Sequence, residues 1–136
     1  MSKLDVVEIW KELHRMPEPG MNEFKTGEFL ADALEKLGYE VTRGVGKTGV
    51  VGVVRGKESG PVVMLRADMD ALPVTETTGA SFASCNPGVM HACGHDCHTA
   101  MLLTAALVLQ ETREEWGGVV RLAFQPAEES GEGALS

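Results

Sequence analysis

The chain has 136 residues, of which 43% are hydrophobic and 24% are charged, enough for one domain with a substantial core. Its formal net charge is −8, and an acidic surface repels phosphate backbones and anionic lipid headgroups. We therefore expect neither nucleic acid nor a membrane among its partners. The sequence shows no signal peptide and no apolar stretch long enough to span a bilayer, so the cytoplasm is the expected compartment.

The first part of the sequence has helical periodicity. Apolar residues recur at helical spacing in residues 4–15 and again in residues 22–37, which predicts two helices. Proline and glycine in residues 17–20 separate the two. Asn22 is the expected N-cap of the second helix, and Gly38 is well placed to end it.

The pattern then changes to that of strands. Residues 39–45 and 49–55 predict two strands joined by a hairpin turn at residues 46–48. A further turn is expected at residues 56–61. The short apolar run at residues 62–67 that follows it suits a buried central strand.

One helix and one strand are expected in the second half. Residues 74–92 are irregular, residues 96–112 predict a helix that is apolar over most of its surface, and residues 119–124 predict a strand. That helix would form a βαβ crossover if the strands at 62–67 and 119–124 are parallel. The expected fold is a single α/β domain spanning residues 1–136, with a mixed, mostly parallel sheet and flanking helices.

A dense group of metal-binding residue types occupies residues 91–98, which contain three His and two Cys. Cys93 and His95 can both reach one ion when the backbone turns at Gly94, and glycine permits that turn. A thiolate with an imidazole suits zinc and metals of similar softness. A lone Cys-x-His pair is a weak signal, but the local density of such residues strengthens it.

Carboxylates follow two of the predicted strands. Glu128 and Glu129 come directly after the last strand, and Asp68 and Asp70 follow the strand at 62–67. Ligands of open α/β sheets bind beyond the carboxyl ends of the strands. Adjacent glutamates usually form a solvated surface, but beside a Cys/His cluster one can bind a metal while the other accepts a proton from water.

Three motifs in order resemble those of a known family. They are RADMDALP at 66–73, MHACGHDCHTA at 90–100 and FQPAEE at 124–129, preceded by LHRMPEPG at 13–20. Together they resemble the metallo-amidohydrolases of the aminoacylase/carboxypeptidase superfamily, which include hippurate hydrolase, N-acyl-amino-acid amidohydrolases and plant auxin-conjugate hydrolases. The resemblance covers essentially the whole chain and implies a zinc-peptidase-like catalytic domain.

The resemblance also implies a cofactor and residue roles. The cofactor would be two divalent metal ions, zinc or manganese, with cobalt or nickel as alternatives. Cys93, His95 and Glu129 would be ligands, with the Cys93 thiolate bridging the two ions. Glu128 would be the general base, and Asp70 would stand beside a ligand. The implied reaction is hydrolysis of the amide bond of N-acyl amino acids or related small amides.

The other polar residues of the cluster have structural interpretations. We interpret His91 and His98 as structural and Cys97 as a packed thiol. Asp96 is expected to cap the following helix or to orient His95.

The family is longer than this sequence and contributes two more histidine ligands and a lid domain. The present sequence has four His and none after His98. We therefore expect residues 1–136 to be an N-terminal portion of a catalytic domain that is inactive alone, without the lid domain or the C-terminal half. Alternatives are a non-catalytic metal-binding module, or a domain that completes its site with another chain. An exposed sheet edge would favour self-association. Thiol chemistry at Cys93 is a further alternative.

Overall fold

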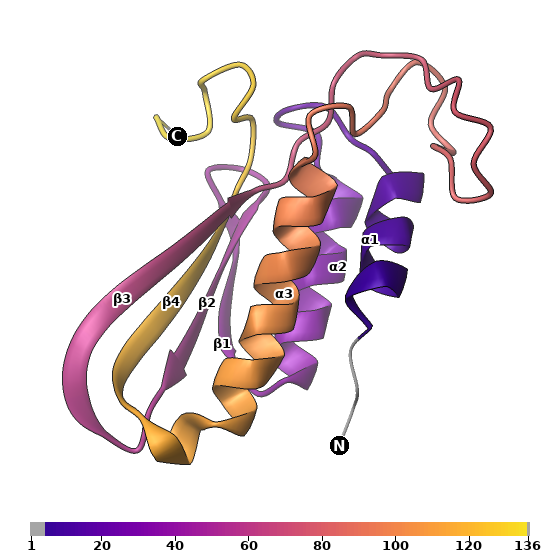
Figure 1. Cartoon of the computed structure of the whole chain (residues 1–136). Coiled ribbons are helices and arrows are strands. Elements are labelled where there is room, and N and C mark those ends of the chain that lie inside the picture. The colour runs from indigo at the N-terminus through magenta and orange to yellow at the C-terminus, as the bar shows by residue number, and fades with distance from the viewer. Residues whose placement is uncertain (1–4, 136) are drawn as a thin grey trace.

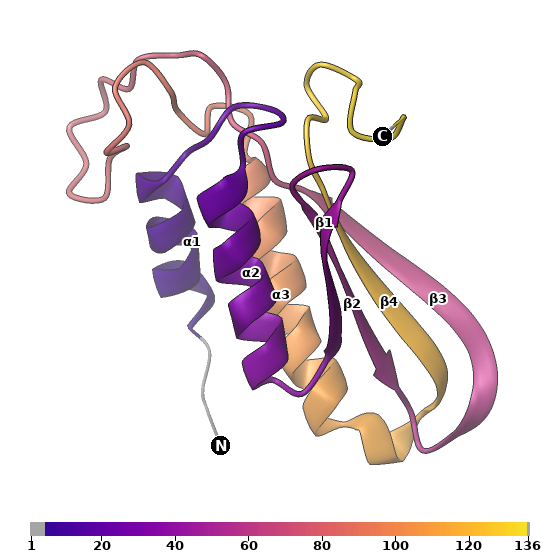
Figure 2. The same cartoon turned by 180° about the vertical axis from the view of Figure 1, so that it is seen from behind.

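A computed structural model describes residues 5–135 and shows a four-stranded sheet with α2 and α3 packed on one face and α1 packed against α3 on the side away from the sheet (Figures 1 and 2). In chain order the elements are α1 (Val6–Arg15), α2 (Phe24–Lys36), β1 (Glu40–Val45), β2 (Gly49–Arg55), β3 (Glu58–Asp68), α3 (His95–Glu111), the short 3-10 helix η1 (Arg113–Glu115) and β4 (Gly117–Gln125). The expected α/β class and the order of its elements are confirmed. No helix within residues 5–135 is long and apolar enough to cross a membrane.

The sheet has the strand order β1-β2-β4-β3. β1 pairs with β2 and β2 pairs with β4 in antiparallel fashion, whereas β3 and β4 are parallel and are connected through α3. The sheet is therefore mixed, as expected, but only one of its three pairings is parallel. The predicted hairpin turn lies between β1 and β2, because Val45 pairs with Gly49.

The strand predicted to be central lies at the edge of the sheet. β3 begins already at Glu58, so the turn expected at residues 56–61 is shorter than predicted. Residues 58–66 are all exposed, including Val62 and Met64, each 58% exposed. The prediction of a strand is confirmed, but β4 is its only partner in the sheet among the described residues.

The core lies between the helices and the sheet. Its largest fully buried apolar side chains come from α1, α2, α3 and β4, and Met69 follows β3: Leu13, Leu30, Leu34, Met69, Leu103, Leu122 and Phe124. Burying each such side chain stabilises the fold by roughly 1.5–3 kcal/mol. This core fixes α3 against the sheet and so fixes the position of its N-terminus. α3 is less buried than expected, because Met101 and Val108 are more than half exposed.

The ends of the first two helices differ in detail from the prediction. Asp5 caps α1 by accepting hydrogen bonds from the amides of residues 7 and 8, and the predicted start at residue 4 lies outside the described residues. Asn22 does not cap α2, which begins after Glu23. Instead the Glu18 carboxylate accepts hydrogen bonds from the first amides of α2. Gly38 follows the C-cap residue Leu37 with a φ of 90°, a left-handed value that glycine adopts without strain.

The long connection between β3 and α3 is anchored on α1. The Cys85 amide donates to the Arg15 carbonyl at 2.8 Å, and the Phe82 ring packs on Trp10 with 4.9 Å between ring centroids. The connection leads directly into the Cys/His cluster at the start of α3. Its path therefore helps to set where that cluster lies.

Candidate metal centre

The polar segments singled out in the sequence meet at one end of the molecule. β3 and β4 are parallel and end beside each other, and α3 begins at the same end (Figure 1). The segments after the two strands therefore lie next to the N-terminus of α3. This is the edge at which ligands of α/β sheets bind.

Three predicted ligands lie within reach of a single ion. The Cys93 thiol, a ring nitrogen of His95 and a carboxylate oxygen of Glu129 are all within 4.8 Å of one another. The Nε2 atom of His95 lies 3.4 Å from Glu129 Oε1 and 3.7 Å from Glu128 Oε2. The adjacent glutamates thus point at the histidine rather than only into solvent.

His95 is held in a single orientation. Its side chain is buried, and Nδ1 lies 2.9 Å from the Asp70 carbonyl oxygen and 3.1 Å from Asp70 Oδ1. Both of these atoms are acceptors, so Nδ1 is the donor to Asp70 and Nε2 is the ring nitrogen that faces the thiol and the glutamates. This is the arrangement in which a histidine binds a metal through Nε2.

Asp70 also supports the glutamate turn. Its second carboxylate oxygen, Oδ2, accepts a hydrogen bond of 3.1 Å from the Glu129 amide. Asp70 is only 2% exposed. One buried carboxylate therefore links the backbone of Glu129 to the ring of His95, which fits its expected position beside a ligand.

Asp68 belongs to the same cluster, although no role was assigned to it from the sequence. Its Oδ2 lies 3.6 Å from His95 Nε2, and its Oδ1 accepts a hydrogen bond of 2.6 Å from His98 Nδ1. Burial opposes the charge of Asp68, but the His98 hydrogen bond and the two imidazoles outweigh it and lower its pKa. The three residues form a second group that could hold a metal. His98, interpreted as structural, is thus half-exposed and hydrogen-bonded to Asp68 within this second group.

The cluster is strongly acidic. Carboxylates of Asp68, Glu128 and Glu129 all lie within 3.7 Å of His95 Nε2. The hydrogen bond with Glu129, burial and the nearby carboxylates raise the pKa of the Cys93 thiol to about 11. A divalent cation would offset this negative charge, and thiolate, imidazole and carboxylate are suitable zinc ligands. The residues present therefore fit the expected metal.

The raised pKa of Cys93 counts against the thiol-chemistry alternative. A nucleophilic cysteine needs a lowered pKa, which cationic neighbours or a helix N-terminus provide. Cys93 is surrounded by carboxylates instead. At neutral pH its thiol is protonated unless a cation binds beside it.

Three expectations for neighbouring residues need correction or completion. Asp96 is not the N-cap residue of α3, which is Gly94, but its Oδ1 accepts a hydrogen bond of 3.0 Å from the Cys97 amide in the first turn. Its Oδ2 accepts one of 2.7 Å from His14 in α1, so this carboxylate is oriented toward α1 rather than toward the His95 ring. Cys97 is exposed rather than packed. His91 is buried, neither of its ring nitrogens has a hydrogen-bond partner, and burial lowers its pKa to about 4. It is therefore neutral at pH 7.

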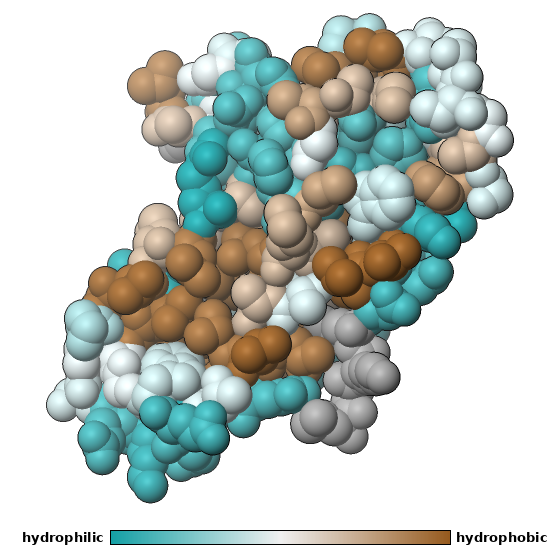
Figure 3. Space-filling view, in the orientation of Figure 1, coloured by the Kyte–Doolittle hydropathy of each residue, from teal (hydrophilic) through white to brown (hydrophobic). Residues whose placement is uncertain are grey.

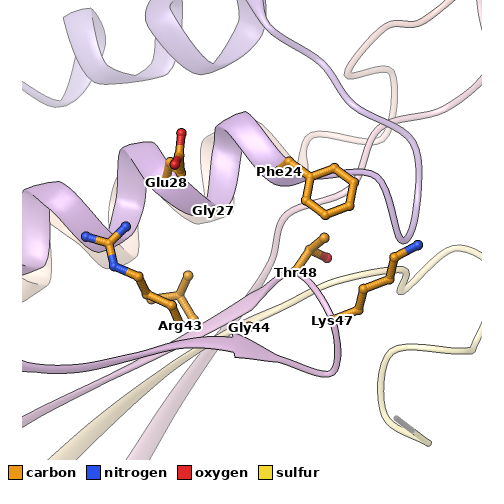
Figure 4. Close-up of a pocket in the computed structure, with 8 residues that line it drawn as sticks. Phe24, Gly27, Glu28, Arg43, Gly44, Lys47 and Thr48 are labelled. Carbon is orange, nitrogen blue, oxygen red and sulfur yellow. The ribbon is translucent and has the colours of Figure 1, made fainter.

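Another hollow lies between α2 and the β1–β2 hairpin (Figure 4). Phe24, Arg43 and Lys47 line it, together with neighbouring residues that include no His or Cys. Arg43 is already paired with Asp32 at 2.7 Å and with Glu35 at 3.0 Å. This hollow therefore lacks the groups for metal-dependent chemistry.

The fold and the cluster define a class, an α/β protein in which a thiol, an imidazole and carboxylates gather at the carboxyl ends of parallel strands and could hold a metal ion. A family model described as peptidase family M20/M25/M40 matches residues 64–136, more than half of the chain. The chain belongs to this family.

Curated relatives are similar along almost all of the chain. The chain is 50% identical to thermostable carboxypeptidase 2 of Saccharolobus solfataricus over 127 residues, which are 93% of this chain and 32% of that protein. It is 46% identical to N-acetyl-L-cysteine deacetylase of Bacillus subtilis, covering 95% of this chain and 31% of the relative. For N-acyl-L-amino acid amidohydrolase of Geobacillus stearothermophilus the identity is 47%, over 93% of this chain and 34% of the relative.

A solved structure has the same fold. The YXEP protein of Bacillus subtilis, a dinuclear metal binding peptidase from the M20 family, superposes with a TM-score of 0.87 at 43% identity. The match covers 91% of this chain and 35% of that chain. The present chain thus spans about a third of the length of the relatives that it matches.

Proposed function

We propose that the chain provides metal ligands and the general base of a two-metal amidohydrolase that cleaves N-acyl amino acids or related small amides. The convergence of Cys93, His95 and Glu129, with Glu128 beside them, carries this proposal. The names of two relatives, an N-acyl-L-amino acid amidohydrolase and an N-acetyl-L-cysteine deacetylase, support the substrate class. Because the chain spans about a third of those relatives, we propose that it is the N-terminal portion of the catalytic domain.

The proposed roles follow from the surroundings of each residue. Cys93, His95 and Glu129 would hold zinc or manganese, with cobalt or nickel as alternatives. When bound, such ions polarise an amide carbonyl and acidify water. Asp70 keeps the proton of His95 on Nδ1 and keeps Glu129 in place through its amide. Asp68 and His98 add a carboxylate and an imidazole close to His95.

Glu128 is the residue that we propose transfers protons. Its side chain is 38% exposed while Oε2 lies 3.7 Å from His95 Nε2, so it reaches both solvent and the donor group. We propose that its carboxylate takes a proton from the water that attacks the amide carbon. After the C–N bond breaks, the same proton passes to the leaving amine. The products are a carboxylic acid and an amino acid.

A hybrid enzyme would test this function. Residues 1–136 would replace the matching segment of the Bacillus subtilis N-acetyl-L-cysteine deacetylase, and release of cysteine from N-acetyl-L-cysteine would be measured. We expect the hybrid to hydrolyse this substrate. Its Glu128→Gln variant should keep its metal but lose about 100-fold or more in kcat. Glu132→Gln, a nearby exposed glutamate, is the matched control and should leave kcat unchanged.

The same hybrid separates this function from the alternative of a non-catalytic metal-binding module. A folded hybrid that binds metal but does not hydrolyse N-acetyl-L-cysteine would favour that module. The isolated chain is expected to show little hydrolysis in either case, because relatives are about three times as long. The hybrid is therefore more informative than the chain alone.

We also propose that two copies of the chain associate through β3. Hydrophobic side chains gather over β3 and the adjoining part of α3 (Figure 3), among them Val62, Met64 and Met101. The other sheet edge, β1, is polar by comparison, and Arg43 there is paired with two acidic residues of α2. Apolar edge strands invite pairing with another strand, whereas charged edges discourage it.

The backbone of β3 is suited to such pairing. The Met69 amide donates to β4, so by alternation the amides of Val62, Met64 and Arg66 face away from the sheet.

Light scattering after size-exclusion chromatography would test the association. We expect a dimer for the wild-type chain and a monomer for Met64→Lys. Val45→Lys, on the β1 edge, is the control and should leave the dimer intact. A wild-type monomer at high concentration would rule the proposal out.

We further propose a cytoplasmic location. Cys85, Cys93 and Cys97 are all free and exposed. Exposed free thiols are typical of proteins in reducing compartments.

A further inference from the structure

Glu23 is a buried carboxylate that the proposed metal centre does not use. It is 0% exposed, and it stands at the N-cap position of α2 without making a side-chain capping bond. Glu18 caps that helix instead, through the amides of Lys25 and Thr26. A buried carboxylate is costly unless its oxygens find donors, so the partners of Glu23 indicate what it does.

Both oxygens of Glu23 turn toward the sheet. Oε1 accepts a hydrogen bond of 2.9 Å from the Thr48 hydroxyl, and Oε2 accepts one of 2.7 Å from the Ala127 amide. Thr48 belongs to the β1–β2 hairpin and borders the hollow of Figure 4. Burial raises the pKa of Glu23, while these donors act in the opposite direction. The carboxylate therefore joins α2, the hairpin and the segment after β4.

Ala127 immediately precedes the two glutamates of the metal centre. Its φ is 47°, a left-handed value that costs free energy for a residue with a side chain. Such a conformation persists when surrounding contacts fix it, and here the Glu23 hydrogen bond holds the Ala127 amide. Two residues later, the Glu129 amide is held by Asp70. Buried carboxylates thus hold the backbone on both sides of Glu128.

The backbone at Gly20 also lies close to Ala127. A methyl group built on Gly20 would lie 3.0 Å from both the Cα and the Cβ of Ala127. The segment that leads into α2 therefore packs directly against the turn. Sequence segments about a hundred residues apart are joined here by the Glu23 hydrogen bond, whose partners are 104 positions apart.

We infer that Glu23 is a positioning residue that sets the backbone of the turn carrying Glu128 and Glu129 from the N-terminus of α2. Its effect on metal binding rests on the proposed function of that turn. The effect on the backbone of the turn itself does not, and the two can be measured separately.

Cobalt(II) titration measures the effect on the metal centre, because a cobalt–thiolate charge-transfer band reports binding beside Cys93. Glu23→Met removes both acceptors while filling a similar volume, and we expect about 10-fold weaker cobalt binding. Glu23→Gln can still accept from the Ala127 amide and donate to the Thr48 hydroxyl, so we expect affinity within about threefold of wild type. Leu34→Ala, which destabilises the core away from the turn, is the control and should leave cobalt affinity unchanged.

These titrations are made at a temperature where circular dichroism shows each variant folded. Wild-type cobalt affinity in a folded Glu23→Met protein would overturn the inference. So would a loss in Glu23→Gln as large as that in Glu23→Met, because the glutamine keeps the hydrogen bonds.

Hydrogen exchange of the metal-free protein tests the backbone directly. We expect the Ala127 amide of the wild type to exchange as slowly as the amides within β4, and to lose this protection in Glu23→Met but not in Leu34→Ala. Rapid exchange in the wild type, at the rate of the exposed amides near Glu132, would overturn the inference even if Glu23→Met does not fold. A wild-type protein that binds no cobalt but protects Ala127 would instead count against the proposed metal function.

Discussion

The two sides of the metal centre differ in how firmly they are held. His95 and Asp70 are buried and joined to each other by hydrogen bonds, whereas Cys93 is exposed and Glu128 and Glu129 are partly open to solvent. The buried side, formed by His95 and Asp70, is therefore the more rigidly positioned of the two. The open side carries the groups that would meet an ion and a substrate, which is typical of metal sites with an accessible coordination position.

The largest effect is expected from the residue shared by the two sides. His95→Ala removes the nitrogen that faces the thiol and three carboxylates, and should weaken zinc binding by more than about 100-fold. Isothermal titration calorimetry measures this. His98→Ala, one turn along α3, is the control and should have a smaller effect. Unchanged zinc affinity in His95→Ala would mean that Nε2 of His95 is not a ligand.

A change of Asp70, the buried hydrogen-bond partner of His95, tests whether the buried side contributes to metal binding. Asp70→Asn should weaken zinc binding about 10- to 100-fold, because an amide cannot offer acceptors both to His95 and to the Glu129 amide. Asp32→Asn, an exposed aspartate in α2, is the control. Unchanged affinity in Asp70→Asn would show that the open side alone determines binding.

Much of the open side could be predicted from the sequence. Cys93 and His95 are close in the chain, and Glu128 and Glu129 are adjacent and follow a recognisable strand. Such local patterns, combined with the rule for strand ends, were enough to bring the residues to one place. Their spatial proximity is confirmed, and their metal-binding roles stay predictions.

The supporting contacts could not be predicted in the same way. Asp68 and His98 are 30 positions apart, His14 and Asp96 are 82 apart, and the pairs meet because α3 packs against β3 and α1. No local pattern encodes such a pairing. A buried polar residue signals that it needs a partner, but not which one.

The position of β3 at the edge of the sheet could not be predicted from a local pattern either. The run Val62–Leu65 indicated correctly that a strand forms and that both of its faces are apolar. Hydrophobicity shows that a strand favours being covered, but not whether the covering element lies within the same chain. The apolar pattern therefore favours a central strand, whereas β3 lies at the edge of the sheet.

The smallest effect on zinc affinity is expected for Glu76, which lies in the long connection and contacts His14 of α1. Hydrogen bonds from Thr78, the Ser84 amide and His14 lower the pKa of Glu76 to about 2, although burial opposes this. A lowered carboxyl pKa stabilises the fold above the unfolded value of 4.5, and this contribution is lost as the pH falls from 4.5 to about 2.

Glu76→Gln should therefore lower the melting temperature at pH 7 and flatten its fall between pH 4.5 and about 2. Thermal unfolding followed by circular dichroism across this pH range measures both. Zinc affinity at pH 7 should change by less than about threefold, because Glu76 is not a ligand. Glu8→Gln, exposed on α1, should leave the pH profile as in the wild type. If the melting temperature of Glu76→Gln falls between pH 4.5 and about 2 as steeply as that of the wild type, the lowered pKa of Glu76 is contradicted.

The most direct test of the metal centre is elemental analysis of the purified chain and of Cys93→Ala, each incubated with zinc or manganese and then desalted. We expect the wild type to retain divalent metal and the variant to lose it, because the thiol is one of three donors that lie within 4.8 Å of one another. A variant with undiminished metal content would contradict the assignment of Cys93, His95 and Glu129 as a ligand set. A wild type that retains no metal would mean that these residues alone do not form a binding site.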